Sequence, residues 1–125
     1  MALEVEIVSQ KPDGRRVLLR GHLDTITAPQ LEAKLAPLLE SPDVRSVVFQ
    51  LEGLVYLSSA GIRCLVRAHK AMAKRGGNVA IVNPQPAVKR VFEIVRALPA
   101  EQVFASDAEF DAYLDAMQRA VRKES

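Results

Sequence analysis

Residues 55–66 read VYLSSAGIRCLV, and two adjacent serines, Ser58 and Ser59, separate the apolar start of this stretch from an amphipathic continuation. The residues that follow keep helical periodicity as far as Arg75. Serine is a favoured cap at a helix N-terminus, where the first backbone N–H groups have no partner within the helix. The stretch therefore predicts a loop that leads directly into a helix at about Ala60, with one of the serines as its cap.

The predicted helix from Ile62 to Arg75 has two chemically distinct faces. At 3.6 residues per turn, its apolar side chains fall on one face and its basic side chains on the other. The apolar face holds Ile62, Leu65, Val66, His69, Met72 and Ala73, and the basic face holds Arg63, Arg67, Lys70 and Lys74. We expect Cys64 to be a small buried hydrophobe, and Arg63 and Arg67 to lie in solvent or against an acidic partner surface.

Strand and helix patterns alternate through the rest of the chain. The predicted strands are residues 3–8, 16–23, 44–51, 79–82 and 102–105, and the other predicted helices begin near Thr27, Pro86 and Ser106. A turn at residues 11–14, KPDG, joins the first two strands as an antiparallel hairpin, and helical crossovers make the later strands parallel. The order predicts one α/β domain, residues 1–125, with a mixed sheet of about five strands, four helices and a polar tail of about residues 119–125.

The first of these helices carries two local signals. Thr27 and Gln30 have the spacing of a capping box, and Pro29 suits the first turn. Pro37 lies inside the apolar periodicity, where a proline costs a helix about 3 kcal/mol. We therefore expect a capped start, and a kink or an early end at Pro37.

Composition narrows the class of protein. The chain has 125 residues, of which 49% are hydrophobic and 26% charged, as in a soluble globular domain. A net charge of +2 and 5% aromatic residues argue against nucleic-acid binding. The single cysteine excludes an internal disulfide, no apolar run approaches the length of a membrane span, and MALEVEI does not read as a signal peptide. We expect a cytoplasmic protein without membrane insertion.

The sequence gives little support to an enzyme or a metal site. The residue types of a nucleophilic triad are present as Ser59, Asp24, and His22 or His69. However, SSAG is not the Gly-x-Ser-x-Gly elbow that exposes a nucleophile. Two distant histidines and one cysteine also lack metal-ligand spacing. We expect no catalysis, no metal and no cofactor.

The stretch around the two serines resembles the loop-to-helix signature of the STAS domain, the fold of anti-sigma factor antagonists, written as an apolar pair followed by Asp-Ser-Ser-Gly-Leu. Tyr56-Leu57 is similar to the apolar pair, Ser59 matches the serine that the family's cognate kinase phosphorylates, and Gly61-Ile62 match Gly-Leu. Ser58 stands in place of the Asp and Ala60 in place of the second serine. The register therefore favours Ser59 as the acceptor, while Ser58 offers a second hydroxyl and removes a negative charge.

Three further stretches agree with the family in order and spacing. Arg20 to Asp24, followed by Ala28 to Leu31, resembles its Gly-x-Leu-Asp and helix entry. Pro86 to Phe92 resembles its third helix, and Phe104 to Phe110 resembles its last strand and final helix entry. The resemblance covers nearly the whole chain.

The resemblance implies a switch that works by exchange of partners. The unphosphorylated domain binds an anti-sigma factor, often a serine kinase, and so frees a sigma factor; the kinase phosphorylates the loop serine, and a serine phosphatase restores it. The residues assigned to this switch loop and partner surface are Asp24, Ser58, Ala60, Gly61, Ile62, Arg63 and Arg67, with Ser59 as the phosphoacceptor. The same surfaces are also suited to a second copy of the chain, as a homodimer.

A rival interpretation keeps the STAS fold and drops the phosphorylation cycle. STAS domains also serve as adaptors in stress-signalling assemblies, in the cytoplasmic parts of anion transporters and beside lipid-transport ATPases. An acceptor serine in register favours the switch over these uses.

Overall fold

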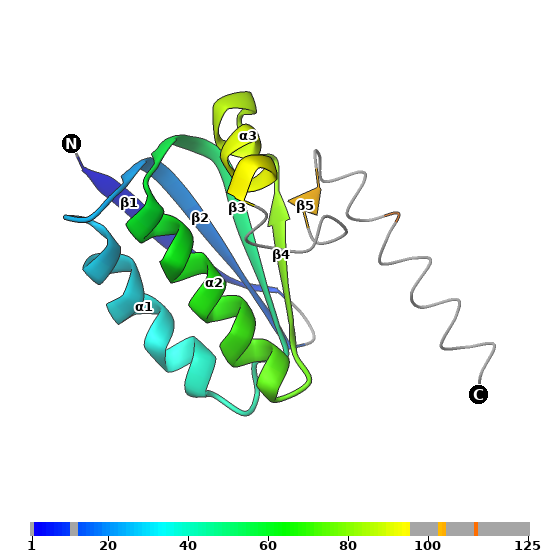
Figure 1. Cartoon of the computed structure of the whole chain (residues 1–125). Helices are drawn as coiled ribbons and strands as arrows, with labels where there is room; N and C mark the ends of the chain where they lie inside the picture. The colour runs from blue at the N-terminus through cyan, green and yellow to red at the C-terminus, as the bar shows by residue number, and fades with distance from the viewer. Residues whose placement is uncertain (1, 11–12, 96–102, 105–111, 113–125) are drawn as a thin grey trace.

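A five-stranded mixed sheet forms the centre of the computed structural model, which describes residues 2–10, 13–95, 103, 104 and 112 (Figure 1). Its strands are β1 (Leu3–Gln10), β2 (Gly14–Leu23), β3 (Ser46–Leu57), β4 (Asn78–Val82) and β5 (Val103–Phe104), and they lie in this order across the sheet. β1 pairs with β2 in antiparallel fashion, and the remaining pairs are parallel. The predicted hairpin and parallel strands are confirmed.

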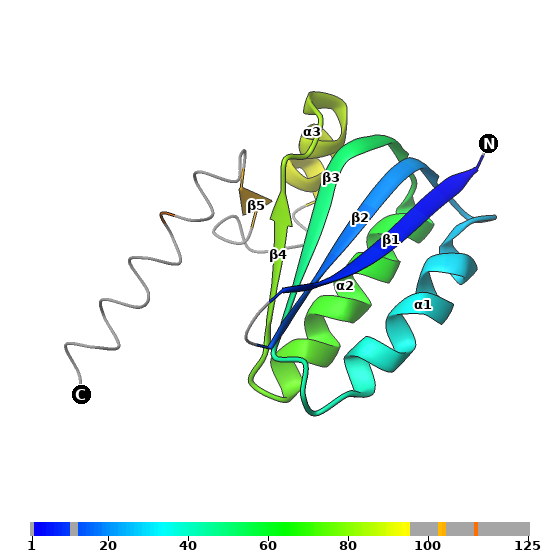
Figure 2. The same ribbon diagram turned by 180° about the vertical axis from the view of Figure 1, so that it is seen from behind.

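In the described part of the chain, three helices alternate with the parallel strands. They are α1 (Ala28–Glu40), α2 (Ser59–Lys74) and α3 (Pro86–Val95). α1 and α2 lie side by side over one face of the sheet, and from behind the strands stand in front of them (Figure 2). Apart from Ala112, the fourth predicted helix lies outside the described residues, as does the predicted tail of residues 119–125. No helix in the described part is long and apolar enough to cross a membrane.

The main core fills the space between the sheet and the two helices. Alternate strand residues point toward the helices, so Leu19 of β2 and Phe49 of β3 are fully buried against Leu35 of α1 and Leu65 of α2. Burial of each such side chain stabilises the fold by about 1.5–3 kcal/mol. On the other face of the sheet, Val48, Ala80 and Val82 form a smaller buried cluster.

β3 is longer than its sequence pattern predicts. The predicted end at Leu51 is wrong, because the strand continues to Leu57. Two register shifts in the pairing of β2 with β3 let β3 take up extra residues without leaving β2. Gly53 lies between them, and a Cβ at this position would be 2.7 Å from Cγ of Arg20. Only one residue, Ser58, therefore separates the strand from α2.

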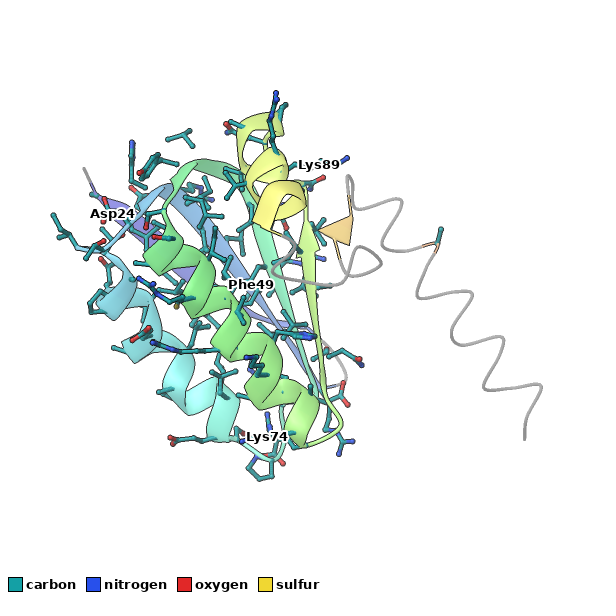
Figure 3. All side chains as sticks on the ribbon, viewed as in Figure 1. Asp24, Phe49, Lys74 and Lys89 are labelled. Carbon is teal, nitrogen blue, oxygen red and sulfur yellow. The ribbon has the colours of Figure 1, made fainter. Side chains whose placement is uncertain are left out.

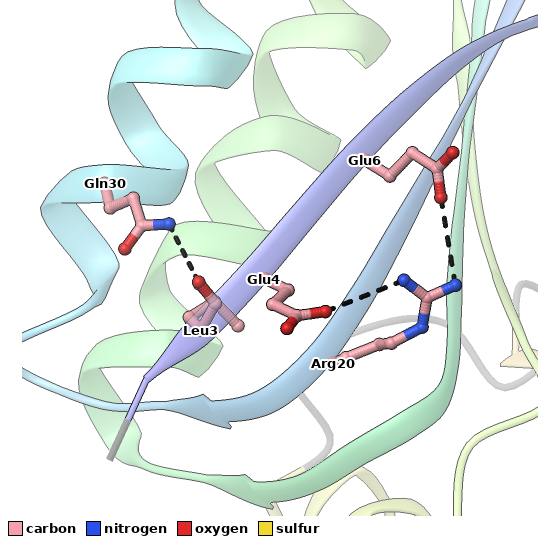
Figure 4. Close-up of polar contacts among 5 residues, drawn as sticks. All are labelled: Leu3, Glu4, Glu6, Arg20 and Gln30. Atoms are coloured by element: carbon pink, nitrogen blue, oxygen red, sulfur yellow. Dashed lines mark hydrogen bonds and ion pairs between the residues drawn. The ribbon is translucent and has the colours of Figure 1, made fainter.

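The start of α1 is held by contacts other than the predicted capping box. Thr27 makes no side-chain cap; its hydroxyl lies 2.8 Å from the carbonyl oxygen of His22. Gln30 reaches across to β1, where its Nε2 donates to the carbonyl oxygen of Leu3 at 2.9 Å (Figure 4). The predicted capping box is wrong, because Gln30 binds a residue that is 27 positions away in the sequence.

Two helix predictions need smaller corrections. α1 does not end at Pro37 but continues to Glu40, since its buried residues, Leu31 and Leu35 among them, fix the helix in the core. In α2 the predicted apolar face is largely buried, but Ala73 is exposed. Cys64 is buried, as predicted.

Candidate functional site

The junction of β3 and α2 is built around the cap formed by Ser58. Oγ of Ser58 accepts a hydrogen bond from the backbone N–H of Gly61 at 3.3 Å, and the extended backbone of Ser58 is typical of a cap. The backbone N–H of Ser58 donates to the carbonyl oxygen of Leu23 at 2.9 Å. The turn is thereby fixed both to its own helix and to the end of β2.

Ser59 lies beside this cap in a different environment. It is the first residue of α2 and is exposed. Its hydroxyl has no hydrogen-bond partner within the part of the chain that the structure describes. The first turn of α2 contains no acidic residue, so the positive end of the helix dipole is not offset there. Of the two serines, Ser59 has the accessible hydroxyl.

Gly61 allows α2 to begin very close to the sheet. A Cβ at this position would lie 2.7 Å from Cγ of Leu23, 2.8 Å from Cδ1 of Leu57 and 2.9 Å from the carbonyl oxygen of Leu23. Contacts this short do not occur between real side chains and backbone. Glycine is therefore required where the first turn of α2 crosses the ends of β2 and β3.

Asp24 organises the neighbouring loop between β2 and α1 (Figure 3). Its Oδ1 accepts hydrogen bonds from the backbone N–H groups of Thr27 and Ile26, both at 3.0 Å. The bond from the backbone of Thr27 is the main cause that lowers the pKa of the Asp24 carboxyl below its usual value. Asp24 follows Leu23, the residue that holds Ser58, so the two loops are adjacent.

Large apolar side chains are exposed on these segments. Ile26 is 87% exposed, and Val55 and Tyr56 at the end of β3 are about half exposed. The ring of Tyr56 lies 5.7 Å from that of His22, between centroids. The sequence pattern does not single out Ile26 or Val55 as site residues. For Ile26 the one local signal is that a large apolar residue stands between two threonines, Thr25 and Thr27, in a polar loop.

Two arginines follow the turn on the exposed side of α2. Arg63 is exposed and has no ion pair with any described residue. Nη1 of Arg67 lies 2.6 Å from Oε1 of Glu32, so this pair joins α2 to α1. Beneath them, burial raises the pKa of the Cys64 thiol to about 11, and the charge of Glu32 adds to this effect. The thiol is therefore protonated and acts as a small hydrophobe.

The predicted switch residues thus fall into three groups. Ser59, Arg63 and Arg67 are exposed, and Asp24, Ser58 and Ala60 are partly buried. Gly61 and Ile62 are buried and support the turn from beneath. The exposed group presents one hydroxyl and two guanidinium groups at the surface.

The triad residues are not assembled. Asp24 binds the loop around Thr27, His22 contacts Tyr56, and buried Nδ1 of His69 has no partner. Within residues 2–10, 13–95, 103, 104 and 112, no group of His, Cys, Asp and Glu is arranged to hold a metal ion.

Comparison with known proteins identifies the fold and its relatives. The family model of the STAS domain matches residues 4–109. A Bordetella bronchiseptica protein assigned as an anti-sigma factor antagonist, BtrV, is 34% identical over 91 residues, which cover 72% of this chain and 78% of that protein. The anti-sigma-B factor antagonist of Bacillus subtilis is 32% identical over 88 residues, which cover 70% of this chain and 78% of that protein.

The structure is also similar to that of the anti-sigma factor antagonist SpoIIAA. Its unphosphorylated form superimposes with a TM-score of 0.73 at 21% identity, over 92% of this chain and 97% of that one. Its phosphorylated form, from Bacillus, gives a TM-score of 0.68 at 20% identity, and the match covers 90% of this chain and 99% of that one. At this identity the similarity establishes the α/β fold.

Proposed function

The chain belongs to the STAS domain family, and on that premise we propose that it is an anti-sigma factor antagonist, which binds an anti-sigma factor and so releases a sigma factor. Two relatives that are 34% and 32% identical carry that name. Exposed Ile26, Val55 and Tyr56 supply apolar contact area next to the switch turn. A regulatory protein of this kind needs a binding surface and no catalytic centre.

We further propose that phosphorylation of Ser59 by the anti-sigma factor, acting as a serine kinase, turns binding off. The observation that carries this proposal is the contrast between the two serines. Ser58 is half-buried and its oxygen caps α2, whereas Ser59 is exposed and its hydroxyl is free of described partners. A kinase needs an accessible hydroxyl, and Ser59 presents one.

A phosphate at Ser59 would change the surface without unfolding the protein. It adds about −1.5 to −2 charges at neutral pH. The N-terminus of a helix tolerates an anion, because its free N–H groups and its dipole both favour negative charge. A partner surface that must lose its water on binding would meet this charge directly. A phosphatase that removes the phosphate would restore binding.

The residue at position 58 fits the same scheme. Ser58 replaces the Asp of the family signature, and serine and aspartate are both strong helix caps. The capping hydrogen bond to Gly61 is therefore kept, and only the negative charge is lost. Kinase recognition in this chain then depends on the turn geometry rather than on an acidic neighbour.

Kinase labelling with matched serine variants tests the proposal. The purified anti-sigma factor of the same host is incubated with ATP and with the wild type, Ser59→Ala or Ser58→Ala, and the product is mapped by peptide mass. We expect one phosphate on the wild type and on Ser58→Ala, and none on Ser59→Ala. Equal labelling of Ser59→Ala would overturn the assignment. Binding without labelling would favour a constitutive adaptor.

A further inference from the structure

One exposed face of α2 carries only positive charge. We define the α2 stripe as Arg63, Arg67, Lys70 and Lys74, all of which are exposed. α2 contains no Asp or Glu. Its 16 residues extend over about 24 Å, from the switch turn to Lys74 at the far end (Figure 3). The stripe therefore begins beside Ser59 and continues well beyond it.

The sheet face opposite α1 and α2 differs from the α2 stripe, because it carries paired charges of both signs. Arg20 of β2 lies 3.8 Å from both Glu4 and Glu6 of β1 (Figure 4). Such exposed pairs add little stability, but they place the positive charge of Arg20 beside charges of opposite sign.

The α2 stripe is compensated at one position only. Arg67 pairs with Glu32 of α1. Arg63, Lys70 and Lys74 have no ion pair or hydrogen bond from their side chains among the residues that the structure describes. Three of the four cations are therefore free to meet groups outside this part of the chain.

The spacing of these cations works against the helix itself. Arg63 and Arg67 are four residues apart, as are Lys70 and Lys74, and Arg67 and Lys70 are three apart. Like charges at these spacings destabilise a helix, and α2 has no acidic residue to offset them, although Lys74 in the last turn is favoured by the helix dipole. The arrangement costs stability within the chain, which favours a role for the stripe in binding something negatively charged.

We propose that the α2 stripe docks an acidic face of the anti-sigma factor. This inference rests on the proposed function and adds the chemistry of the partner. Complementary charge of this kind mainly raises the association rate and fixes the orientation of the complex. It also explains why phosphorylation would weaken binding. A phosphate on Ser59 would pair with Arg63, one turn away, and would repel the carboxylates of the partner.

Charge reversal at the far end of the stripe separates docking from the switch. Lys70→Glu/Lys74→Glu changes residues 11 and 15 positions beyond Ser59. The matched control, Lys89→Glu/Arg90→Glu, makes the same change in net charge on exposed residues of α3. A milder variant, Lys70→Gln/Lys74→Gln, removes charge without adding repulsion. Native far-UV circular dichroism of each variant confirms that it is folded.

Stopped-flow association with the purified anti-sigma factor is the readout. At 50 mM salt we expect Lys70→Glu/Lys74→Glu to lower the association rate constant at least tenfold. The rate constant of Lys70→Gln/Lys74→Gln should lie between this value and that of the wild type. The control should stay within about twofold of the wild type. At 500 mM salt the difference in association rate between the variants should nearly vanish, because salt then screens the attraction between charges over a much shorter distance.

Three results would overturn the inference. If the wild type binds the anti-sigma factor and the two double reversals bind equally well, the stripe is a solvated face and the proposed function stands. If the wild type does not bind the anti-sigma factor, both the proposed function and this inference fail. If the reversal abolishes binding to duplex DNA or to phosphatidylserine vesicles but not to the anti-sigma factor, the stripe recognises phosphate groups instead.

Discussion

The backbone N–H of Ser58 donates a hydrogen bond to the carbonyl oxygen of Leu23 at 2.9 Å, and this bond joins the end of β3 to the end of β2 one residue before α2 begins. It also brings the loop of Asp24 and Ile26 next to Ser59. A partner that contacts Ser59 therefore meets both loops, and the rigidity of the turn depends on how closely α2 approaches the two strands.

Gly61→Ala should destabilise the protein. The added methyl group would lie 2.7–2.9 Å from atoms of Leu23 and Leu57, so the first turn of α2 must move away from the sheet. Overpacking of this kind costs about 1–3 kcal/mol. Urea unfolding gives the free energy of unfolding, with Ser59→Ala as the exposed control from the same turn. A Gly61→Ala variant as stable as wild type would contradict the packing described here.

Ser58→Ala should cost about 1 kcal/mol of stability through loss of the helix cap, whereas Ser58→Asp should keep the cap. The reason is the bond from the N–H of Gly61 to Oγ of Ser58, which alanine cannot accept and aspartate can. Thermal unfolding monitored by circular dichroism compares the two variants. A Ser58→Ala variant as stable as the wild type would show that Ser58 does not act as a cap.

Asp24 should contribute stability that depends on pH. Its pKa is lowered in the folded protein, so the unfolded chain binds the proton more readily. The contribution is complete above the unfolded pKa of about 4 and is lost as pH falls through the lower folded value. Unfolding of the wild type and Asp24→Asn should therefore differ at pH 7 and converge toward pH 3. A difference between the two proteins that stays constant from pH 7 to pH 3 would contradict this role of Asp24.

Cys64 should react slowly with thiol reagents in the folded protein. Its thiol is buried and its pKa is about 11, so the reactive thiolate is scarce at pH 8. Labelling by iodoacetamide should accelerate strongly in concentrated urea, where the thiol regains an ordinary pKa and access to solvent. Rapid labelling of the native protein would mean that the first half of α2 opens readily.

Much of this fold follows from local patterns in the sequence. The hairpin, the parallel strands, the span of α2 and the cap at its start all have short-range signals, such as the KPDG turn and the helical periodicity after Ser59. The accessible hydroxyl of Ser59 is also consistent with the register of the family signature.

The remaining features depend on contacts between distant residues. Glu52 and Gly53 interrupt the apolar pattern, so the end of β3 could not be placed before the register shifts against β2 were seen. Gln30 reads as part of a local cap, yet its partner is the carbonyl of Leu3. The exposure of Ile26 likewise results from the hydrogen bonds of Asp24, which a single sequence does not display.

The affinity of the anti-sigma factor for the two states of Ser59 tests the central claim most directly. The chain is prepared with serine or with phosphoserine at position 59, and each form is titrated into the anti-sigma factor by isothermal titration calorimetry. We predict that the phosphate weakens binding at least tenfold, which corresponds to about 1.4 kcal/mol. Equal affinity of the two forms would contradict the account.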